Sequence, residues 1–558
     1  MRALSISLAL PHPHLVTASP QARDPRLDLR CDRFLSGVAK SLVAGRDRDL
    51  LAPLVFAAPG ALPDLDSRPG ERALIAAELE RANASYGHPR ARELARRFAD
   101  PSTLVVVAGQ QAGLFGGPLY TLTKMAGAAL VAERLERAGR SAVAAFWVAT
   151  EDHDFAEVAR AGLLGLQGPR TIDLGDDPAP LEPVGMRTLG PRLDAALDAV
   201  RALYPGAVDG DAWRLLTASY RPDARFGEAF SRFLIGLLGG RAPLLVDSML
   251  PSLKRVERPW LARAVERRHQ ICDALGERSS RVVDTGHSLQ VEDDRSAAPL
   301  LVVSGRERRR VLWQGADRWL LRGGGPGAAP RPVDELLDLV ADNPSVVSPG
   351  VLLRPIVQDA VLGTALQLMG PGELAYLAQA APLYSLLEVD APHVALRPQM
   401  LVLDAKQRGH LASLDLALEE LLRDESALHV LLVRGGAADE IETLRAAALA
   451  TLDRSKGDCL AMDATLERPF EKTREHVGRA LELFAARLRA AAVRRDELVR
   501  SRSTALRDAC LPGGAPQERG LAVAHFALRY GAGFGGAVMA QLDVESDRVQ
   551  VIDPEAAS

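Results

Sequence analysis

The feature that most constrains the fold of this 558-residue chain is a strand, a glycine-rich turn, a helix and a second strand in direct succession. The β-branched run 103–108 predicts a buried strand, and the turn 109–117 follows it. Pro118 suits the first position of a helix, which is predicted to run to Ala138. Residues 141–149 predict the next strand. Strands joined through a helix lie parallel, so the sequence predicts a βαβ unit within a parallel sheet.

The turn before the predicted helix has the features of an anion site. Glycines allow close backbone approach, and a helix start presents free N–H groups to a phosphate or carboxylate. The segment matches neither the GxGxxG pattern nor a Walker A loop, so a tight turn without a ligand is the alternative. The candidate ligand-binding residues here are Gly109, Gln110, Gln111, Gly113, Phe115, Gly117, Pro118, Tyr120, Thr121 and Lys124.

An acidic loop follows the second predicted strand. Its residues are the catalytic candidates Glu151, Asp152, His153 and Asp154. Three carboxylates and an imidazole can supply a general base, hold a cation or bind an amine. Asp154, with a glutamate three residues later, also matches an acidic variant of a helix-capping box. Parallel strands end at one sheet edge, so we expect the glycine-rich turn and this loop to face one crevice.

Three further sites combine a turn with charged or aromatic groups. Segment 354–359 holds Arg354 and Gln358, and segment 370–376 holds Glu373 and Tyr376. The third site is Arg397, which precedes a proline. Each is a candidate substrate-binding residue. Taken alone, these patterns favour helix capping and core packing.

Composition excludes several classes of protein. The chain is 47% hydrophobic and 25% charged, as in ordinary globular proteins. Its 68 basic and 72 acidic residues give a net charge of -4, which does not favour a nucleic-acid or membrane partner. No apolar run approaches the ~20 residues of a membrane helix, and the apolar stretch 4–10 is a poor signal peptide.

The cysteines and histidines also constrain the chemistry. Cys31, Cys272, Cys459 and Cys510 lie far apart, which argues against a zinc ribbon or a disulfide scaffold. The histidines are scattered, so we predict no metal centre. A reduced, cytoplasmic location is the simplest expectation.

Residues 405–510 differ in character from the rest of the chain. One series has 3-4-3 spacing, Leu411, Leu414, Leu418 and Leu421. A second has 4-3-4-3 spacing, Val477, Leu481, Phe484, Leu488 and Ala491. These heptad spacings predict an antiparallel coiled-coil hairpin, broken at 435–436 and 456–457, with a plain helical subdomain as the alternative.

The expected organisation has three parts. Residues 1–404 form an α/β core with connecting insertions, and residues 405–510 form the helical arm. Residues 511–558 return to the core, beginning with a Pro/Gly break and a final helix over 517–530.

Two motifs closely resemble the BshC family of bacillithiol biosynthesis. They are VAGQQAGLFGGPLYT at 107–121 and FWVATEDHD at 146–154. The resemblance continues in matching order at 348–358, 370–376, 395–398 and 516–531. It implies a Rossmann-like core related to class I synthetases and nucleotidylyltransferases, with a coiled-coil arm that forms a homodimer. One departure is Thr123, where the resemblance leads us to expect a histidine before the motif lysine.

The resemblance implies a ligase that adds cysteine in the last step of bacillithiol synthesis. It joins the carboxyl group of L-cysteine to the glucosamine amine of glucosaminyl malate, giving a low-molecular-weight thiol. A carboxylate needs activation, so ATP or another adenine nucleotide is expected against residues 113–121 near Lys124. The acidic loop would bind an amine and accept a proton, and Arg354 or Arg397 would bind the malate carboxylates. The alternatives are a nucleotide-binding scaffold and a nucleotidylyltransferase for another metabolite.

Overall fold

The computed structural model describes residues 27–28, 34–35, 37–60, 62–324, 329–433 and 436–556. The apolar stretch 4–10 and Cys31 lie outside the described residues. Contacts divide the chain into two compact units, one of residues 404–510 and one of the described residues of 26–403 and 511–556. Within the described ranges, no helix has the length and apolar character needed to cross a membrane.

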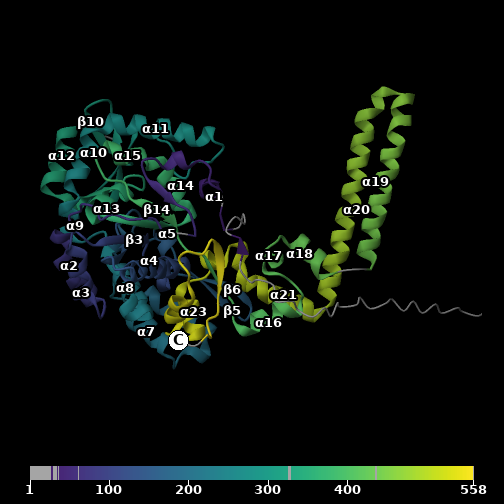
Figure 1. The fold of residues 1–558 in the computed structure, drawn as a ribbon, viewed down its shortest axis with the longest axis horizontal. Helices are drawn as coiled ribbons and strands as arrows, with labels where there is room; N and C mark the ends of the chain where they lie inside the picture. The colour runs from purple at the N-terminus through teal and green to yellow at the C-terminus, as the bar shows by residue number, and fades with distance from the viewer. Residues whose placement is uncertain are drawn as a thin grey trace, which may run out of the picture. The chain divides into compact units, whose positions relative to one another are not determined.

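A six-stranded sheet with only parallel pairings forms the centre of the larger unit (Figure 1). In spatial order its strands are β2 (Val55–Ala57), β14 (His393–Leu396), β13 (Thr364–Met369), β3 (Leu104–Gln110), β4 (Ala142–Val148) and β7 (Leu244–Asp247). The helix α4 (Tyr120–Arg137) joins β3 to β4. The predicted βαβ unit and parallel sheet are therefore confirmed.

Burial explains why these segments form strands. Every residue of β4 is buried, as expected for a strand covered on both faces. Helix α4 packs on β3, β4 and β13. It begins two residues later than predicted, because Pro118 forms a β-bridge with Ala522 and the N–H of Leu119 donates to the carbonyl of Leu521. The final stretch of the chain thus fixes the start of this helix.

Smaller sheets are built around this core. A five-stranded antiparallel sheet has the order β11 (Arg331–Pro332), β10 (Arg318–Leu321), β9 (Glu307–Trp313), β8 (Ala297–Ser304) and β12 (Val347–Pro349). The others are the hairpin of β5 (Arg160–Gly165) and β6 (Gly168–Asp173), and the sheet of β1 (Leu27–Asp28), β16 (Arg548–Ile552) and β15 (Met400–Val402). Strand β16 pairs with β1 and β15, so the C-terminal segment is part of the larger unit.

Helices fill the connections between these strands. In chain order they are α1 (Gly37–Val43), α2 (Arg72–Ser85), α3 (Ala91–Ala99), α5 (Phe155–Val158), α6 (Arg192–Leu203), α7 (Asp211–Ser219), α8 (Phe226–Leu238), α9 (Pro251–Val256), α10 (Arg258–Glu266), α11 (Arg268–Asp284), α12 (Val333–Asp342), α13 (Arg354–Leu362), α14 (Pro371–Ala380), α15 (Pro382–Leu386), α22 (Gln517–Gly520), α23 (Val523–Tyr530) and α24 (Phe534–Gln541). The single helix predicted over 517–530 is wrong, because an extended Leu521 separates α22 from α23.

The smaller unit is entirely helical in its described residues. Its helices are α16 (Ala405–Ser413), α17 (Leu418–Leu421), α18 (Glu425–Leu432), α19 (Ala437–Met462), α20 (Glu467–Arg495) and α21 (Glu497–Cys510). The two long helices α19 and α20 pack along each other, which confirms the predicted helical arm. Ion pairs also cross between them, including Arg474 with Asp453 at 2.6 Å.

The details of the predicted hairpin need correction. Leu411 lies in α16, and Leu418 and Leu421 lie in α17. Leu414 lies between these short helices, beside Asp415, whose φ is 50°, so the series does not form the first long helix. The expected break at 456–457 lies inside α19, and Gly435 lies outside the described residues. In α20, Phe484 is 50% exposed whereas the neighbouring Ala485 is buried. The packed face is therefore shifted from the predicted one.

Candidate active site

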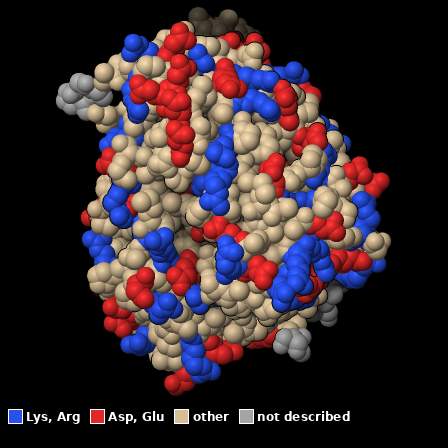
Figure 2. Space-filling model, turned by 90° about the vertical axis from the view of Figure 1, so that its left-hand side faces the viewer, with Lys and Arg blue, Asp and Glu red and all other residues tan. Residues whose placement is uncertain are grey.

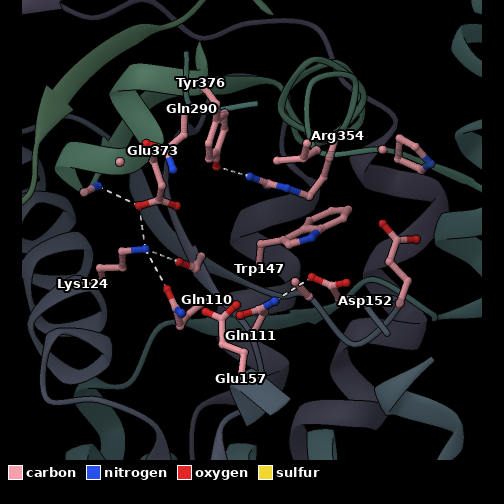
Figure 3. Close-up of a pocket in the computed structure, with 18 of the residues that line it drawn as sticks. Gln110, Gln111, Lys124, Trp147, Asp152, Glu157, Gln290, Arg354, Glu373 and Tyr376 are labelled. Carbon is pink, nitrogen blue, oxygen red and sulfur yellow. Dashed lines mark hydrogen bonds and ion pairs between the residues drawn. The ribbon is translucent and has the colours of Figure 1, made fainter. Parts of the chain in front are cut away.

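A cavity of about 480 Å³ lies at the carboxyl end of the central sheet (Figure 3). Residues at or just after the ends of four adjacent strands line it: Gln110 for β3, Asp152 for β4, Glu373 for β13 and Arg397 for β14. Ligands of open parallel sheets bind at this edge, where the direction of the strand order reverses. The cavity is therefore the candidate active site.

The structure brings most of the predicted residues together here. Those that line the cavity are Gly109, Gln110, Gln111, Tyr120, Lys124, Glu151, Asp152, His153, Arg354, Glu373, Tyr376 and Arg397. Those that do not are Gly113, Phe115, Gly117, Pro118, Thr121, Asp154 and Gln358.

The second half of the glycine-rich turn, residues 113–118, packs into the core. The N–H of Gly116 donates to the hydroxyl of Tyr220 at 2.7 Å, and the N–H of Leu119 donates to the carbonyl of Leu521 at 2.8 Å. These amides are therefore occupied by protein acceptors. The amides of Gly116 and Leu119 are therefore not free to bind a phosphate, and nucleotide binding at this turn stays a prediction.

Asp154 and Gln358 have local structural contacts instead. Asp154 is exposed, and its carboxylate accepts the N–H of Glu157 at 3.1 Å, which caps α5 as the alternative interpretation predicted. Gln358 is buried and accepts a hydrogen bond from Arg354 at 2.8 Å. Asp154 thus contributes to the helix start, and Gln358 orients an arginine that lines the cavity.

Lys124 joins three parts of the cavity wall. Its Nζ lies 2.6 Å from Oε2 of Glu373, and it donates to the carbonyl of Gly109 at 2.7 Å and to Oε1 of Gln110 at 2.9 Å (Figure 3). Burial lowers the pKa of Lys124, although the charge of Glu373 opposes this. Lys124 therefore ties the end of β3 to the start of α14, and its contacts are already used within the protein.

Arg397 is likewise engaged by another residue. Its two terminal nitrogens lie 2.8 and 2.6 Å from the carboxylate of Glu518, and both side chains are almost fully buried. A bidentate pair of this kind is geometrically specific and strong. The prediction that Arg397 binds a malate carboxylate does not fit this arrangement, because its paired nitrogens already hold a carboxylate.

Tyr120 stands among cations at the same side of the cavity. Its ring centroid lies 5.6 Å from Nζ of Lys124 and 5.4 Å from the guanidinium carbon of Arg397. Arg519, from the C-terminal segment, lies 5.9 Å from the ring. Burial raises the pKa of Tyr120 to about 12, so its hydroxyl stays protonated at neutral pH.

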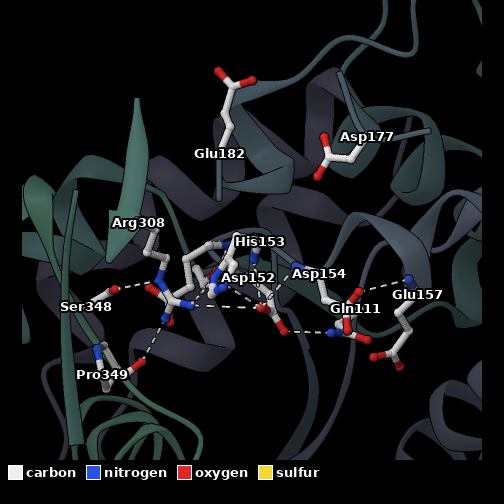
Figure 4. Close-up of polar contacts among 12 residues, drawn as sticks. Gln111, Asp152, His153, Asp154, Glu157, Asp177, Glu182, Arg308, Ser348 and Pro349 are labelled. Carbon is white, nitrogen blue, oxygen red and sulfur yellow. Dashed lines mark hydrogen bonds and ion pairs between the residues drawn. The ribbon is translucent and has the colours of Figure 1, made fainter. Parts of the chain in front are cut away.

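Asp152 is a fixed, ionised carboxylate that lies across the cavity from Lys124 (Figure 3), and Figure 4 shows its polar contacts. It accepts from Nε2 of Gln111 at 2.6 Å and from the N–H of His153 at 2.7 Å, and Arg308 lies 3.9 Å away. Burial acts to raise the pKa of Asp152, but the charge of Arg308 and these hydrogen bonds hold it below the usual value. Asp152 can therefore bind a cationic amine.

His153 is held in its neutral form. Its Nδ1 lies 3.3 Å from a terminal nitrogen of Arg308, which can only donate. Burial and the charge of Arg308 lower the pKa of His153. Since Nδ1 accepts this hydrogen bond, we assign the ring proton to Nε2, which makes His153 a donor at neutral pH.

Glu157 is a site residue that the sequence pattern assigned only to a capping box. Its backbone serves the cap, but its side chain lines the cavity beside Gln111 (Figure 4). Burial and the neighbouring charges of Asp154 and Asp152 raise the pKa of Glu157. The cavity thus holds one carboxylate with a lowered pKa and one with a raised pKa, which is the arrangement that separates acid and base roles.

Glu151 belongs to a buried charge cluster behind the cavity wall. Nζ of Lys254 lies 3.0 Å from Glu151 and 2.6 Å from Glu257, and all three side chains are buried. Burial, together with the charge of Glu151, raises the pKa of Glu257 to about 7, although Lys254 opposes this. Glu151 therefore anchors the acidic loop to Lys254 of α9.

Other lining residues are not among the predicted site residues. They include Trp147, Gln290, Arg308, Arg310 and Arg519. Arg308 and Arg310 belong to a run of charges at 306–310, a pattern that is typical of a solvated surface. Both arginines line the cavity because β9 places them on the face of the strand that borders it.

The described residues hold no metal cluster, and the face drawn in Figure 2 shows no continuous basic patch. The described residues include no group of three His, Cys, Asp or Glu side chains placed to hold a metal ion. On the face that Figure 2 shows, Lys and Arg side chains are interspersed with Asp and Glu.

Two family models together match most of the chain. Residues 61–398 match the N-terminal Rossmann-like domain of bacillithiol biosynthesis BshC, and residues 400–554 match its C-terminal coiled-coil domain. These matches agree with the parallel sheet and the long helical hairpin.

Curated relatives are similar over most of their length. A protein of Solibacter usitatus is 29% identical over 497 residues, covering 88% of this chain and 91% of its own. One of Heliobacterium modesticaldum is 33% identical, covering 65% and 68%, and one of Thermus thermophilus is 30% identical, covering 80% and 90%. Each is named "Putative cysteine ligase BshC". The chain therefore belongs to the BshC family of bacillithiol biosynthesis.

Proposed function

We propose that this protein joins the carboxyl group of L-cysteine to the glucosamine amine of glucosaminyl malate within the cavity at the carboxyl end of the sheet. The observation that carries this proposal is the pair Asp152 and Glu157, whose pKa values are shifted in opposite directions beside the shared neighbour Gln111. An amine nucleophile needs both a carboxylate that binds it and a base that accepts its proton.

Asp152 and Glu157 have different roles in this mechanism. Asp152 stays ionised and orients the amine. The amine nitrogen attacks the activated carboxyl carbon of cysteine, the C–N bond forms, and the bond to the activating group breaks. The proton that leaves the nitrogen passes to Glu157, because a carboxylate of raised pKa is the stronger base. His153 donates a hydrogen bond through Nε2 to a substrate oxygen.

Activation of the cysteine carboxyl group by ATP or another adenine nucleotide stays a prediction. The expected binding residues do not fit a phosphate as they are arranged, since the amides of Gly116 and Leu119 and the ammonium of Lys124 have protein partners. The roles of Asp152 and Glu157 do not depend on the identity of the activating group.

The proposal also includes a homodimer formed through the helical arm and a cytoplasmic location. The α19–α20 hairpin carries large exposed apolar side chains, Leu444, Met462, Leu483 and Phe484, which support pairing with a second copy of the chain. Cys272 and Cys459 are unpaired and partly exposed, which supports a reducing cytoplasm.

A complementation experiment tests the proposed reaction. A bacillithiol-producing strain that lacks its own cysteine ligase is supplied with this gene, and thiols are quantified in extracts. We expect the wild type and Asp154→Asn to restore bacillithiol, because asparagine also caps a helix. Asp152→Asn should leave unligated glucosaminyl malate to accumulate. Restoration by Asp152→Asn at the wild-type level, with equal protein amounts, would remove the basis of the proposal.

A further inference from the structure

Three arginines from two elements line the cavity. Arg308 and Arg310 lie on β9, two residues apart, so their side chains project from the same face of that strand. Arg354 comes from the first turn of α13. The local sequence explains the pair, because a strand places alternate residues of a charged run on one face.

Within the described residues, none of these guanidinium groups donates a hydrogen bond to a carboxylate. Arg354 donates to the neutral oxygens of Gln358 at 2.8 Å and Tyr376 at 2.6 Å. Arg308 donates to Ser348 at 2.8 Å and to the carbonyl of Pro349 at 3.0 Å, and its ion pair with Asp152 is long, at 3.9 Å. Arg308 and Arg310 therefore place positive charge at the cavity wall, whereas the charges of Glu373, Glu151 and Asp359 act on Arg354.

Arg310 is the least satisfied of the three. In the described part of the chain its guanidinium has no hydrogen bond and no ion pair, although the residue is only partly exposed and lines the cavity. Burial and the charges of Arg322 and Arg308 lower the pKa of Arg310, although the charges of Asp294 and Glu292 oppose this. A partly buried unpaired cation is costly unless a ligand supplies the counter-charge.

We propose that Arg310, with Arg308 and Arg354, forms a subsite for the dianionic malyl group of the acceptor substrate. This rests on the proposed function and reassigns the malate contact from Arg397 to Arg310. The planar fork of arginine matches the two oxygens of a carboxylate. A phosphate group shares this chemistry, so the experiment must separate the two anions.

Calorimetric titration of the full-length protein tests the subsite with two probes, L-malate and inorganic phosphate. The variant is Arg310→Gln. The matched control is Arg309→Gln, since Arg309 is the neighbour on the same strand, projects from the other face and does not line the cavity. We expect malate to bind the wild type and the control within twofold of each other, and to bind Arg310→Gln at least tenfold more weakly.

Three results would overturn the assignment. The first is malate affinity unchanged in Arg310→Gln. The second is no malate binding by the wild type up to tens of millimolar. The third is that phosphate binds in an Arg310-dependent manner whereas malate does not, which would assign the cluster to a phosphate group.

Steady-state kinetics separates the subsite from the proposed reaction. Arg310→Gln should raise KM for glucosaminyl malate at least tenfold and change kcat by less than threefold. Arg310-dependent malate binding in a wild-type protein that forms no amide would contradict the ligase proposal and leave the subsite intact.

Discussion

At the scale of single residues, the cavity separates two carboxylates by their surroundings. Asp152 faces Arg308 and the amide of Gln111, whereas Glu157 faces the negative charges of Asp152 and Asp154. The same chemical group is thus kept ionised at one position and made more basic at the other. The reaction rate should therefore depend on the protonation of Glu157.

Glu157→Gln should lower kcat by about 10²-fold or more, the usual contribution of a positioned base. Because the pKa of Glu157 is raised, its protonation in acid should remove the base, and the wild-type kcat should fall on the acidic side of neutrality. A pH profile of kcat for the wild type, Glu157→Gln and Glu157→Asp measures this. We expect the acidic limb to vanish in Glu157→Gln and partial activity in Glu157→Asp. An unchanged profile in Glu157→Gln would rule out this role.

The buried cluster of Glu151, Lys254 and Glu257 predicts a pH effect on stability. The pKa of Glu257 is raised from 4.5 to about 7 in the folded protein. The folded state therefore holds a proton that the unfolded state releases, so this contribution is present below about pH 4.5 and is lost as the pH rises towards 7. Urea unfolding of Glu257→Gln should show a flatter dependence of unfolding free energy on pH between 5 and 7 than the wild type. An identical slope would show that Glu257 does not titrate there.

At the scale of elements, the long helices of the arm carry a glycine in an exposed helical position. Gly457 lies inside α19, and a Cβ atom at this position would meet no atom within 4 Å. Gly457→Ala should therefore stabilise the arm by about 1 kcal/mol, because alanine restricts the unfolded chain and favours helix. Thermal unfolding followed by helical circular dichroism measures the shift, and a lower transition temperature would contradict it.

The exposed apolar side chains of the hairpin predict an association site. Leu483 and Phe484 are 52% and 50% exposed on α20. Replacing both with glutamate should shift a dimer towards monomer in sedimentation analysis, since burying charge at an interface is unfavourable. The matched control replaces exposed Arg487 with glutamate on the same helix. Equal association states for the wild type and the double variant would exclude these residues from the interface.

The elements also show what sequence can and cannot predict. The βαβ unit was predictable, because a β-branched run, a glycine turn and a proline at a helix start are local signals. The heptad seam was not, because Phe484 and Ala485 both suit a helix and only packing decides which one is buried. In the site, Glu157 matched a capping pattern and Arg310 lay in a run of charges, so neither was predicted to line the cavity. Their places in the cavity depend on contacts with segments that are distant in sequence.

At the scale of the whole molecule, the larger unit gathers its site from widely separated parts of the chain. Gln111 and Asp152 come from the βαβ unit, Arg310 from the inserted antiparallel sheet, Glu373 from the turn after β13, and Arg519 from the C-terminal segment. Strand β16 and the bridge at Ala522 attach that last segment to the core. The cavity is thus complete only when the C-terminal segment has packed against the core.

The most direct test is the rate of bacillithiol formation by purified protein supplied with L-cysteine, glucosaminyl malate and ATP, measured by mass spectrometry. We predict that the wild type forms the product and that Asp152→Asn forms it at least 100-fold more slowly. Asp154→Asn, which changes a carboxylate outside the cavity, should stay within twofold of the wild type. No product from the wild type, or equal rates for the wild type and Asp152→Asn, would contradict the account.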